Sequence, residues 1–468
     1  MPIIIVIAAL AAAGWLGFMA AAGAQYAVVM LLGTIMVALF AFFSPKLSLV
    51  LLVFSMLLSP ELGGGAVDAG RSLVVRYDDI LLVIIFLSWF AKTALFKDKP
   101  FITATPVQTP VLLYTSLCVV STAFGIIRGD IALKASFFYV LKYIEYFLLY
   151  FMTVNIVDSE EDVKKYMRYG VVVAVLVTFY AYYFYYGSGA GPDARATAPF
   201  EVPLGGDIRE SEPASLGGYY LIVFGILFAL LTETGGTSVL KVLGLVVFIF
   251  PAFLITFSRS SYLGFAVMMP ALFFFTAKRR FFMLGFLAAV LFAAAIIPGL
   301  AGKVKSRITM TYAGVYATQS FSAGTVGSIK LEDSAASRIY SMKRALLEKF
   351  PKHPVFGWGV TGVGLADTQY ALVLGELGVL GVALFIWMLY RLFYTAKKVF
   401  NSYADPYIRA LALGFMVSLF GLLAQSFGVN SFVIVRIMEP FWFIAACLSV
   451  LAIKKPGTPG AEGPARTG

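Results

Sequence analysis

The chain is poor in charged residues, cysteine and histidine, and each shortage excludes a class of protein. Only 13% of the 468 residues are charged, about half the usual share, whereas 60% are hydrophobic, which excludes a soluble globular enzyme and a disordered chain. The two cysteines, Cys118 and Cys447, both lie in apolar runs and cannot form a disulfide framework. The single histidine, His353, argues against a histidine-rich metal site, and the P-loop, H-E-x-x-H and G-x-S-x-G motifs are absent.

Long apolar runs occupy most of the chain. About 14 of them approach the roughly 18–25 residues that a helix needs to cross a bilayer core of about 30 Å. They lie near 3–22, 25–43, 46–59, 78–96, 108–127, 136–156, 167–187, 214–233, 238–257, 261–277, 281–299, 367–390, 407–428 and 431–452. We therefore predict the all-α fold class, a polytopic transmembrane helical bundle of about 12 to 14 spans. The run 46–59 is short, and its Ser-Pro flanks leave open whether it crosses fully.

The distribution of basic residues predicts the orientation. With the N-terminus in the cytoplasm, most Lys and Arg fall at inner ends, for example Lys164-Lys165 and Lys278-Arg279-Arg280, as the positive-inside rule requires. An even number of spans then places the tail 454–468 in the cytoplasm too. This tail is rich in Pro and Gly, and we expect it to be disordered.

The basic residues predicted in the short outer loops are nearly all arginines. They are Arg71, Arg76, Arg128, Lys134, Arg195, Arg209, Arg259 and Arg436. Guanidinium groups bind phosphate through a planar fork, so this set predicts a phosphate-bearing ligand at the outer face. The alternative is that each arginine anchors a helix end. The net charge of +11 lies at span ends, which favours membrane lipids and an anionic substrate as partners and no nucleic acid.

One polar segment, 301–366, interrupts the apolar pattern on the outer side. Within it, Ser334 to Phe350 carries apolar residues at helical spacing and a basic face, which predicts an amphipathic helix. The chain then divides into N-terminal helices at 1–213 with an outer loop at 188–213, central helices at 214–300, the outer loop 301–366 and C-terminal helices at 367–453.

Three short segments combine charged and small residues in a fixed order. The first places Ser258-Arg259 between two apolar runs, where an arginine is costly unless it has a partner. The second contains Arg338 in the amphipathic helix and, beyond it, the turn His353-Pro-x-x-Gly-Trp-Gly359. The third is Asp367-Thr368, which nine residues separate from Gly378-x-x-Gly381.

Together these segments resemble the O-antigen ligase and O-antigen polymerase superfamily, from about Leu216 to Gly381. The resemblance implies a glycosyltransferase of the bacterial inner membrane that acts at the periplasmic face. It also implies an undecaprenyl-pyrophosphate-linked oligosaccharide as substrate, with other polysaccharide export components as candidate partners. No cofactor is expected, because the activated bond of such a substrate already carries the energy.

The dipeptide Asp367-Thr368 departs from the ligase pattern, in which similar proteins have His-Asn or His-Ser. We therefore expect a polymerase that joins lipid-linked repeat units into a surface polysaccharide or exopolysaccharide. One alternative is a ligase that transfers finished glycan to a lipid or protein acceptor. Another, from a different class, is a polysaccharide transporter or flippase.

The chemistry of the transfer suggests roles for individual residues. Arg259 and Arg338 would stabilise the leaving pyrophosphate, with Arg195 and Arg209 behind them, and Asp367 would remove the proton of the acceptor hydroxyl. The predicted substrate-binding residues also include Tyr370, His353 and Trp358, and no metal is expected. The alternatives are that Asp367 caps the next helix, that Glu376 is the structural partner of a buried polar group, and that His353 bonds to loop backbone.

Overall fold

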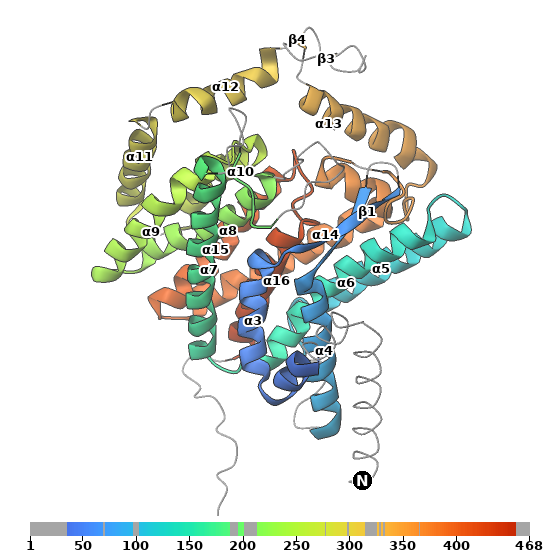
Figure 1. The fold of residues 1–468 in the computed structure, drawn as a ribbon, viewed down its shortest axis with the longest axis horizontal. Helices are drawn as coiled ribbons and strands as arrows, with labels where there is room; N and C mark the ends of the chain where they lie inside the picture. Colours follow the sequence, from blue (N-terminus) through green and yellow to red (C-terminus); the bar gives the residue numbers. More distant parts are fainter. Residues whose placement is uncertain are drawn as a thin grey trace, which may run out of the picture.

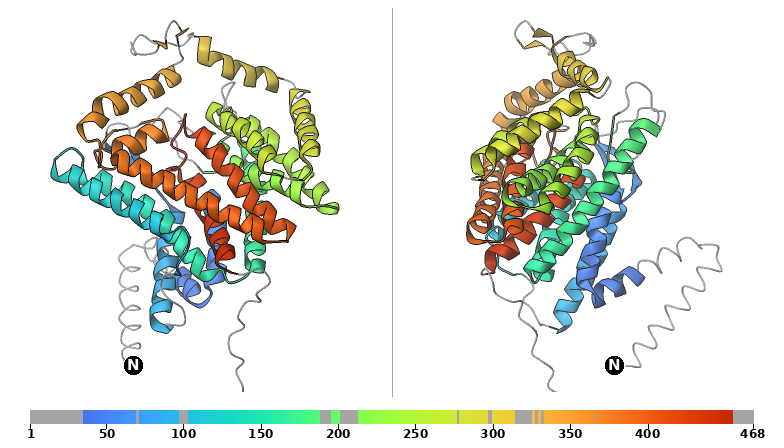
Figure 2. Two further views of the ribbon diagram at one scale, coloured as in Figure 1. Left: turned by 180° about the vertical axis from the view of Figure 1, so that it is seen from behind. Right: turned by 90° about the vertical axis from the view of Figure 1, so that its left-hand side faces the viewer.

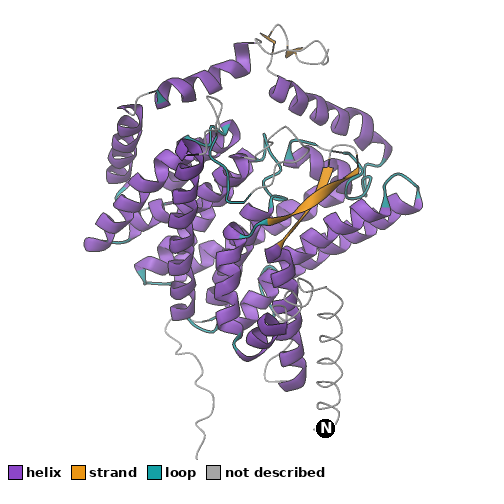
Figure 3. Cartoon of the chain, in the orientation of Figure 1, coloured by secondary structure: helices purple, strands orange, loops and turns teal. Residues whose placement is uncertain are grey.

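The computed structural model describes residues 35–68, 71–96, 103–187, 195–200, 213–276, 278–296, 299–313, 325–326, 329–330, 333–364 and 366–454. These parts of the chain are almost entirely helical (Figures 1 and 3), so the predicted all-α, polytopic fold class is confirmed. The predicted span 3–22, most of the span 25–43, Arg209 and the tail beyond residue 454 lie outside the described residues.

The helices follow one another along the chain with two short strand pairs between them. Before the polar segment lie α3 (Pro45–Leu58), α4 (Tyr77–Phe96), α5 (Gln108–Ile127), α6 (Leu133–Ile156), α7 (Glu160–Gly187), α8 (Pro213–Glu233), α9 (Thr237–Leu254), α10 (Arg259–Phe275) and α11 (Arg280–Ile296). The polar segment forms α12 (Leu300–Ala313) and α13 (Asp333–Lys343), and α14 (Gln369–Ser402), α15 (Pro406–Gln425) and α16 (Val435–Ile453) follow. The antiparallel pairs are β1 (Glu61–Asp68) with β2 (Arg71–Arg76), and β3 (Thr325–Val326) with β4 (Ile329–Lys330).

Nine of the described helices are long and apolar enough to cross a membrane, namely α4 to α9 and α14 to α16. Two shorter apolar helices, α3 and α10, coincide with further predicted runs. With 14 residues, α3 is only about 21 Å long, so it falls short of a bilayer core, as its Ser-Pro flanks suggested. The amphipathic helix predicted at 334–350 begins at Asp333 and changes at Arg344–Lys349 to a wider, π-helical turn.

Three helices form the centre of the bundle. The apolar windows of α8, α15 and α16 are 83%, 78% and 89% buried, whereas those of α4 and α7 are only 28% buried. Small residues let the central helices approach closely, since a Cβ added to Gly225 of α8 would lie 2.7 Å from the carbonyl oxygen of Gly414 on α15. The helices α4 and α7 therefore present most of their side chains to lipid.

The polar segment forms an arch over one end of the bundle. Helices α12 and α13 form this arch in Figure 1, and α11, which coincides with the predicted span 281–299, leads up to it. Both views of Figure 2 place the arch at the same end of the bundle. The arch lies beyond the N-terminus of α10 and the N-terminus of α14, where the motif residues are found. The predicted outer loop 301–366 thus faces the end of the bundle that carries these motifs.

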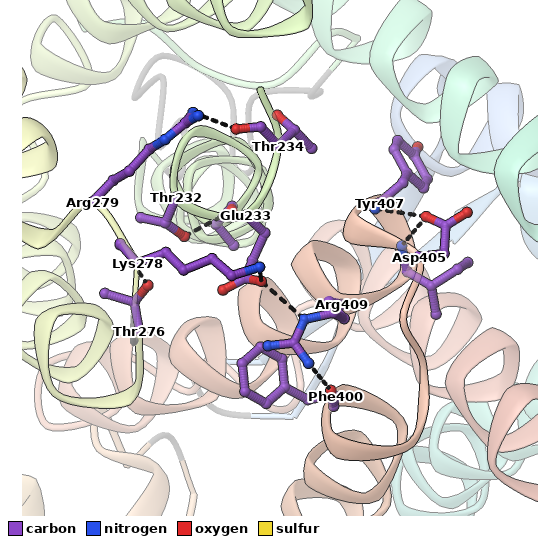
Figure 4. Close-up of polar contacts among 12 residues, drawn as sticks. Thr232, Glu233, Thr234, Thr276, Lys278, Arg279, Phe400, Asp405, Tyr407 and Arg409 are labelled. Carbon is purple, nitrogen blue, oxygen red and sulfur yellow. Dashed lines mark hydrogen bonds and ion pairs between the residues drawn. The ribbon is translucent and has the colours of Figure 1, made fainter. Parts of the chain in front are cut away.

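At the other end of α8, α10 and α15, ion pairs join three connections. The buried carboxylate of Glu233 lies 2.9 Å from Arg409 Nε and 3.5 Å from Lys278 Nζ (Figure 4). The guanidinium of Arg409 also donates to the carbonyl of Phe400 at 2.9 Å. This end carries the lysine-rich connections that the positive-inside rule assigns to the cytoplasm.

Candidate active site

A tight turn between α9 and α10 positions Arg259. Phe257 adopts a φ of 48°, and the buried hydroxyl of Ser258 caps α10 by accepting the N–H of Ser261 at 3.4 Å. Arg259 is the first residue of α10 and is half-buried. Arg259 therefore stands at a helix N-terminus, where the free N–H groups and the helix dipole add further positive charge.

Two further arginines lie close to this turn. The segment 195–200 runs beside it, with the N–H of Ala196 donating to the carbonyl of Ile255 at 2.9 Å, so the backbone of Arg195 lies beside the end of α9. From the arch, Arg307 interacts electrostatically with Tyr262, one helical turn beyond Arg259. The sequence interpretation missed Arg307, although the basic run Lys303 to Arg307 places Lys303 and Arg307 on one helix face.

The peptide unit between Ala366 and Asp367 is held from both sides. Its N–H donates to Ser341 Oγ at 3.3 Å, and the Ser341 hydroxyl in turn donates to the carbonyl of Arg338 at 3.0 Å. Its carbonyl, that of Ala366, accepts a 2.6 Å hydrogen bond from Asn430 Nδ2. The helix that carries Arg338 is thereby fastened to the backbone of Asp367, and both side chains are half-buried.

Asp367 does not cap α14, so that alternative is wrong. The N-cap is Thr368, whose hydroxyl accepts the N–H of Ala371 at 3.3 Å. Both Asp and Thr are good caps, and the helix begins one residue later than the sequence suggested. Asp367 therefore precedes the cap residue.

The turn between α15 and α16 links the Arg259 rim to Asp367. A Cβ added to Gly428 would lie 3.1 Å from the Cβ of Ser260, and Gln425 Nε2 donates to Ser261 Oγ at 2.9 Å. Two residues after Gly428, Asn430 holds the carbonyl of Ala366. Short chains of contacts thus gather the backbones of Arg259, Arg338 and Asp367 around one rim.

The predicted turn at 353–359 packs against a break in α14. Gly357, Gly359 and Gly378 adopt φ values of 71°, 89° and 67°, which only glycine takes without strain. At the break, the N–H of Val379 donates to the carbonyl of Pro354 at 2.9 Å. The buried carboxylate of Glu376 accepts the N–H of Thr361 at 2.7 Å, which is the structural role that one reading of the sequence gave it.

His353, Trp358 and Tyr370 all contribute to local packing. The indole N–H of Trp358 donates to the carbonyl of Lys349 at 2.8 Å, and Lys349 Nζ lies 4.0 Å from the centre of the Trp358 ring. The His353 ring meets that ring edge-on at 4.4 Å, and partial burial together with the Arg128 charge lowers the His353 pKa. The Tyr370 hydroxyl donates to the carbonyl of Leu423 at 2.7 Å. Binding of substrate by these three residues remains a prediction.

A second group of charges is buried near the β1–β2 hairpin. Carboxylate oxygens of Asp78, Asp79 and Glu439 lie within 4.8 Å of one another, a spacing that could hold a metal ion. Arg76 Nη2, however, already lies 2.5 Å from Asp78, and Lys142 forms an ion pair with Asp79. These cations fit an internal ion network better than a metal centre, because they would repel a bound cation.

Two of the arginines predicted for the outer face, Arg76 of this network and Arg436, bind the end of α3. Arg76 donates to the carbonyl of Met56 at 2.7 Å, and Arg436 donates to that of Leu57 at 3.1 Å. Both therefore bind the last carbonyls of α3, and both are 3% exposed. For Arg76 and Arg436 the alternative reading, anchoring of a helix end, describes the structure.

An apolar groove lies between α7 and α8. It follows α8 from Tyr219 to Leu230 and is also lined by residues of α3, α9 and α16. On α8, Gly217 lies two residues before Tyr219, and a Cβ there would meet the hydroxyl of Ser261. The groove also reaches Tyr166 of α7 and Tyr407 of α15, so it runs along the apolar middle of the bundle.

Residues 244–386 match the protein family described as O-antigen ligase. The predicted resemblance to the O-antigen ligase and polymerase superfamily is confirmed. The matched region contains Arg259, Arg338, the turn at 353–359 and Asp367. A comparison with curated proteins gave no significant match. The chain is thus an O-antigen ligase-like, multi-pass membrane protein, and members of this family are glycosyltransferase-like ligases or polymerases that act on lipid-linked glycans.

Proposed function

We propose that this protein is a polysaccharide polymerase of the bacterial inner membrane. It joins undecaprenyl-pyrophosphate-linked oligosaccharide units into a surface polysaccharide or exopolysaccharide at the periplasmic face. The observation that carries the proposal is the set of contacts that links the backbones of Arg259, Arg338 and Asp367. These residues come from three elements that are distant in the sequence.

The proposed reaction is a direct displacement at the anomeric carbon of the donor sugar. The acceptor hydroxyl oxygen forms the new glycosidic bond while the bond to the pyrophosphate oxygen breaks. Asp367 takes the hydroxyl proton, and the departing diphosphate gains negative charge that Arg259, Arg338 and Arg195 stabilise. A single displacement inverts the anomeric centre. In the proposed topology, the reaction takes place on the periplasmic side, and both termini lie on the cytoplasmic side.

The groove between α7 and α8 offers a place for the polyprenyl chain of the donor. Its lining is almost wholly apolar, and it follows α8, the helix whose first turn contacts Ser261 at the start of α10. A long isoprenoid lying there would bury its surface against the bundle while its diphosphate reached the arginines. This arrangement matches a substrate with one apolar end and one highly charged group.

The family description favours a second candidate, a ligase that transfers finished glycan to a new acceptor. The aspartate at position 367, where ligases of the resembling pattern have histidine, supports the polymerase. The product of the reaction separates the two. A polymerase lengthens polyprenyl-linked chains, whereas a ligase moves glycan to another lipid or protein.

The deciding experiment uses the purified full-length protein in liposomes with a synthetic undecaprenyl-pyrophosphate-linked oligosaccharide. The products are extracted and sized, first alone and then with candidate lipid acceptors added. A ladder of longer polyprenyl-linked chains is the expected result. Glycan found only on an added acceptor would favour the ligase, and movement of substrate across the bilayer without bond formation would overturn both.

A further inference from the structure

The turn between α15 and α16 contains one polar atom that the protein leaves unsatisfied. Ser426 Oγ donates to the carbonyl of Leu422 at 2.7 Å, and Ser431 Oγ donates to Gln425 Oε1 at 3.0 Å. In the described part of the chain, however, no donor reaches the buried oxygen Asn430 Oδ1. A buried acceptor without a partner costs about as much free energy as a lost hydrogen bond, so its retention calls for a reason.

The orientation of the Asn430 amide follows from its other contact. Asn430 Nδ2 donates to the carbonyl of Ala366 at 2.6 Å, and a carbonyl oxygen can only accept a hydrogen bond. Rotating the amide by half a turn would place two acceptors against each other. The oxygen Oδ1 must therefore point away from Ala366, and whatever satisfies it must bring a donor.

The surroundings place this acceptor beside the proposed reaction centre. Ala366 shares its peptide unit with Asp367, and Gly428, two residues before Asn430, touches Ser260 next to Arg259. The backbone carbonyl of Asn430 accepts the N–H of Val433 at 2.9 Å, which fixes the turn. Asn430 thus stands between the residue proposed to bind diphosphate and the residue proposed to remove a proton.

We propose that Asn430 Oδ1 binds a hydroxyl group of the acceptor sugar and so helps to select which sugar is extended. This inference rests on the proposed function. A sugar hydroxyl is the donor that such a substrate supplies in abundance, and a site built to bind it rejects a sugar that lacks it. Asn430 lies outside the region that matches the O-antigen ligase family, so the selection could differ while the chemistry stays the same.

The test measures acceptor kinetics with purified protein in liposomes. Donor is held at saturation, and a short-chain, water-soluble analogue of the lipid-linked oligosaccharide is varied as acceptor. Asn430→Ala should raise the acceptor KM about tenfold, the factor expected for one lost hydrogen bond. Asn430→Asp keeps an acceptor but lacks the Nδ2 donor, so it should keep a near-normal KM and lose kcat.

Two control variants separate substrate binding from positioning. Ser341→Ala removes the other hydrogen bond to the Ala366–Asp367 peptide unit, so it should lower kcat and leave the acceptor KM unchanged. Ser426→Ala, in the same turn, should behave like the wild type. Elution volume and unfolding temperature check that each variant is folded.

Two results would overturn the inference. Asn430→Ala could lower kcat with an unchanged KM, as Ser341→Ala should, which would reduce Asn430 to a positioning residue. It could also match the wild type, which would mean that water satisfies Oδ1. If the wild type forms no product at all, the proposed function fails, and calorimetric titration with the free oligosaccharide still tests Asn430, with about tenfold weaker binding by Asn430→Ala expected.

Discussion

Two groups of charges meet the outer ends of the helices, and they differ in burial and in use. The network around Arg76 is 3% exposed at Arg76 and 1% exposed at Asp78, and its cations and carboxylates compensate one another within the protein. The rim formed by Arg259, Arg338 and Asp367 is half-buried, and its Arg338 belongs to helix α13 of the arch. The first group secures α3, α4, α6 and α16 to one another, whereas we propose that the second binds a ligand.

The largest effect is expected at Asp367. Asp367→Asn keeps the shape of the side chain but removes the proposed base, so the rate of chain elongation should fall about a thousandfold. The unfolding temperature should stay within error of the wild type, because the carboxylate does not cap α14. Quantifying products of the liposome assay measures the rate, and near-normal elongation by this variant would exclude Asp367 as the base.

Arg259 should follow with a smaller loss. Arg259→Ala removes one group that stabilises the leaving diphosphate, and about a hundredfold loss in kcat/KM is expected. Arg259→Lys keeps the charge but not the planar fork, so it should recover only part of the activity. Arg279→Ala serves as the control, because Arg279 lies after the other end of α10 and donates to the carbonyl of Thr234 (Figure 4). Equal losses in both alanine variants would contradict a specific role for Arg259.

The Arg76 network should matter more than the Arg259 rim for the stability of the protein, the reverse of the order expected for activity. Arg76→Ala leaves Asp78 as a buried carboxylate without its cation, which should lower the free energy of unfolding by about 3–5 kcal/mol. Arg259→Ala, at the half-buried rim, should cost far less. Unfolding in detergent, followed by loss of the folded elution peak, measures both. If the two variants were equally stable, the distinction between a structural and a functional group of charges would be wrong.

The groove gives the smallest predicted effect. Gly170 lines it, and a Cβ added there meets nothing within 4 Å, so Gly170→Phe should fill space without a clash. We expect about a tenfold rise in the KM for the polyprenyl donor, from lost apolar contact. Gly244→Phe is the matched control, since Gly244 lies on α9 with equally open surroundings and does not line the groove. An unchanged KM in Gly170→Phe would remove the groove from the proposed donor site.

The sequence predicted what depends on local patterns. Runs of apolar residues became helices at nearly the predicted positions, because the length of an apolar run decides whether it can span a bilayer. The Ser258-Arg259 turn and the glycines at 357 and 359 were also found, since a helix cap and a positive φ leave a signature within a few residues. The π-helical turn at Arg344–Lys349 was not, because apolar spacing does not reveal a change in helical geometry.

What the sequence did not reveal depends on contacts between distant residues. Arg76 and Arg436 looked like ligand-binding arginines until the fold placed both at the end of α3. The hydrogen bond between Asn430 and Ala366 joins residues 64 positions apart, so no local sequence motif predicts it. Arg307 was also missed, because the composition of the polar segment does not predict that helix α12 brings this residue close to α10.

The clasped peptide bond between Ala366 and Asp367 has a mechanical consequence. Ser341 belongs to the arch and Asn430 to the bundle, and both grip the same rigid plane of atoms. If α13 moves outward to admit a bulky glycan, either the hydrogen bond from the Asp367 N–H to Ser341 breaks or the Ala366–Asp367 peptide unit moves with the helix. An open arch would then displace the Asp367 carboxylate from its position. Water that enters with the substrate would find no base in place, so the activated donor would not be hydrolysed.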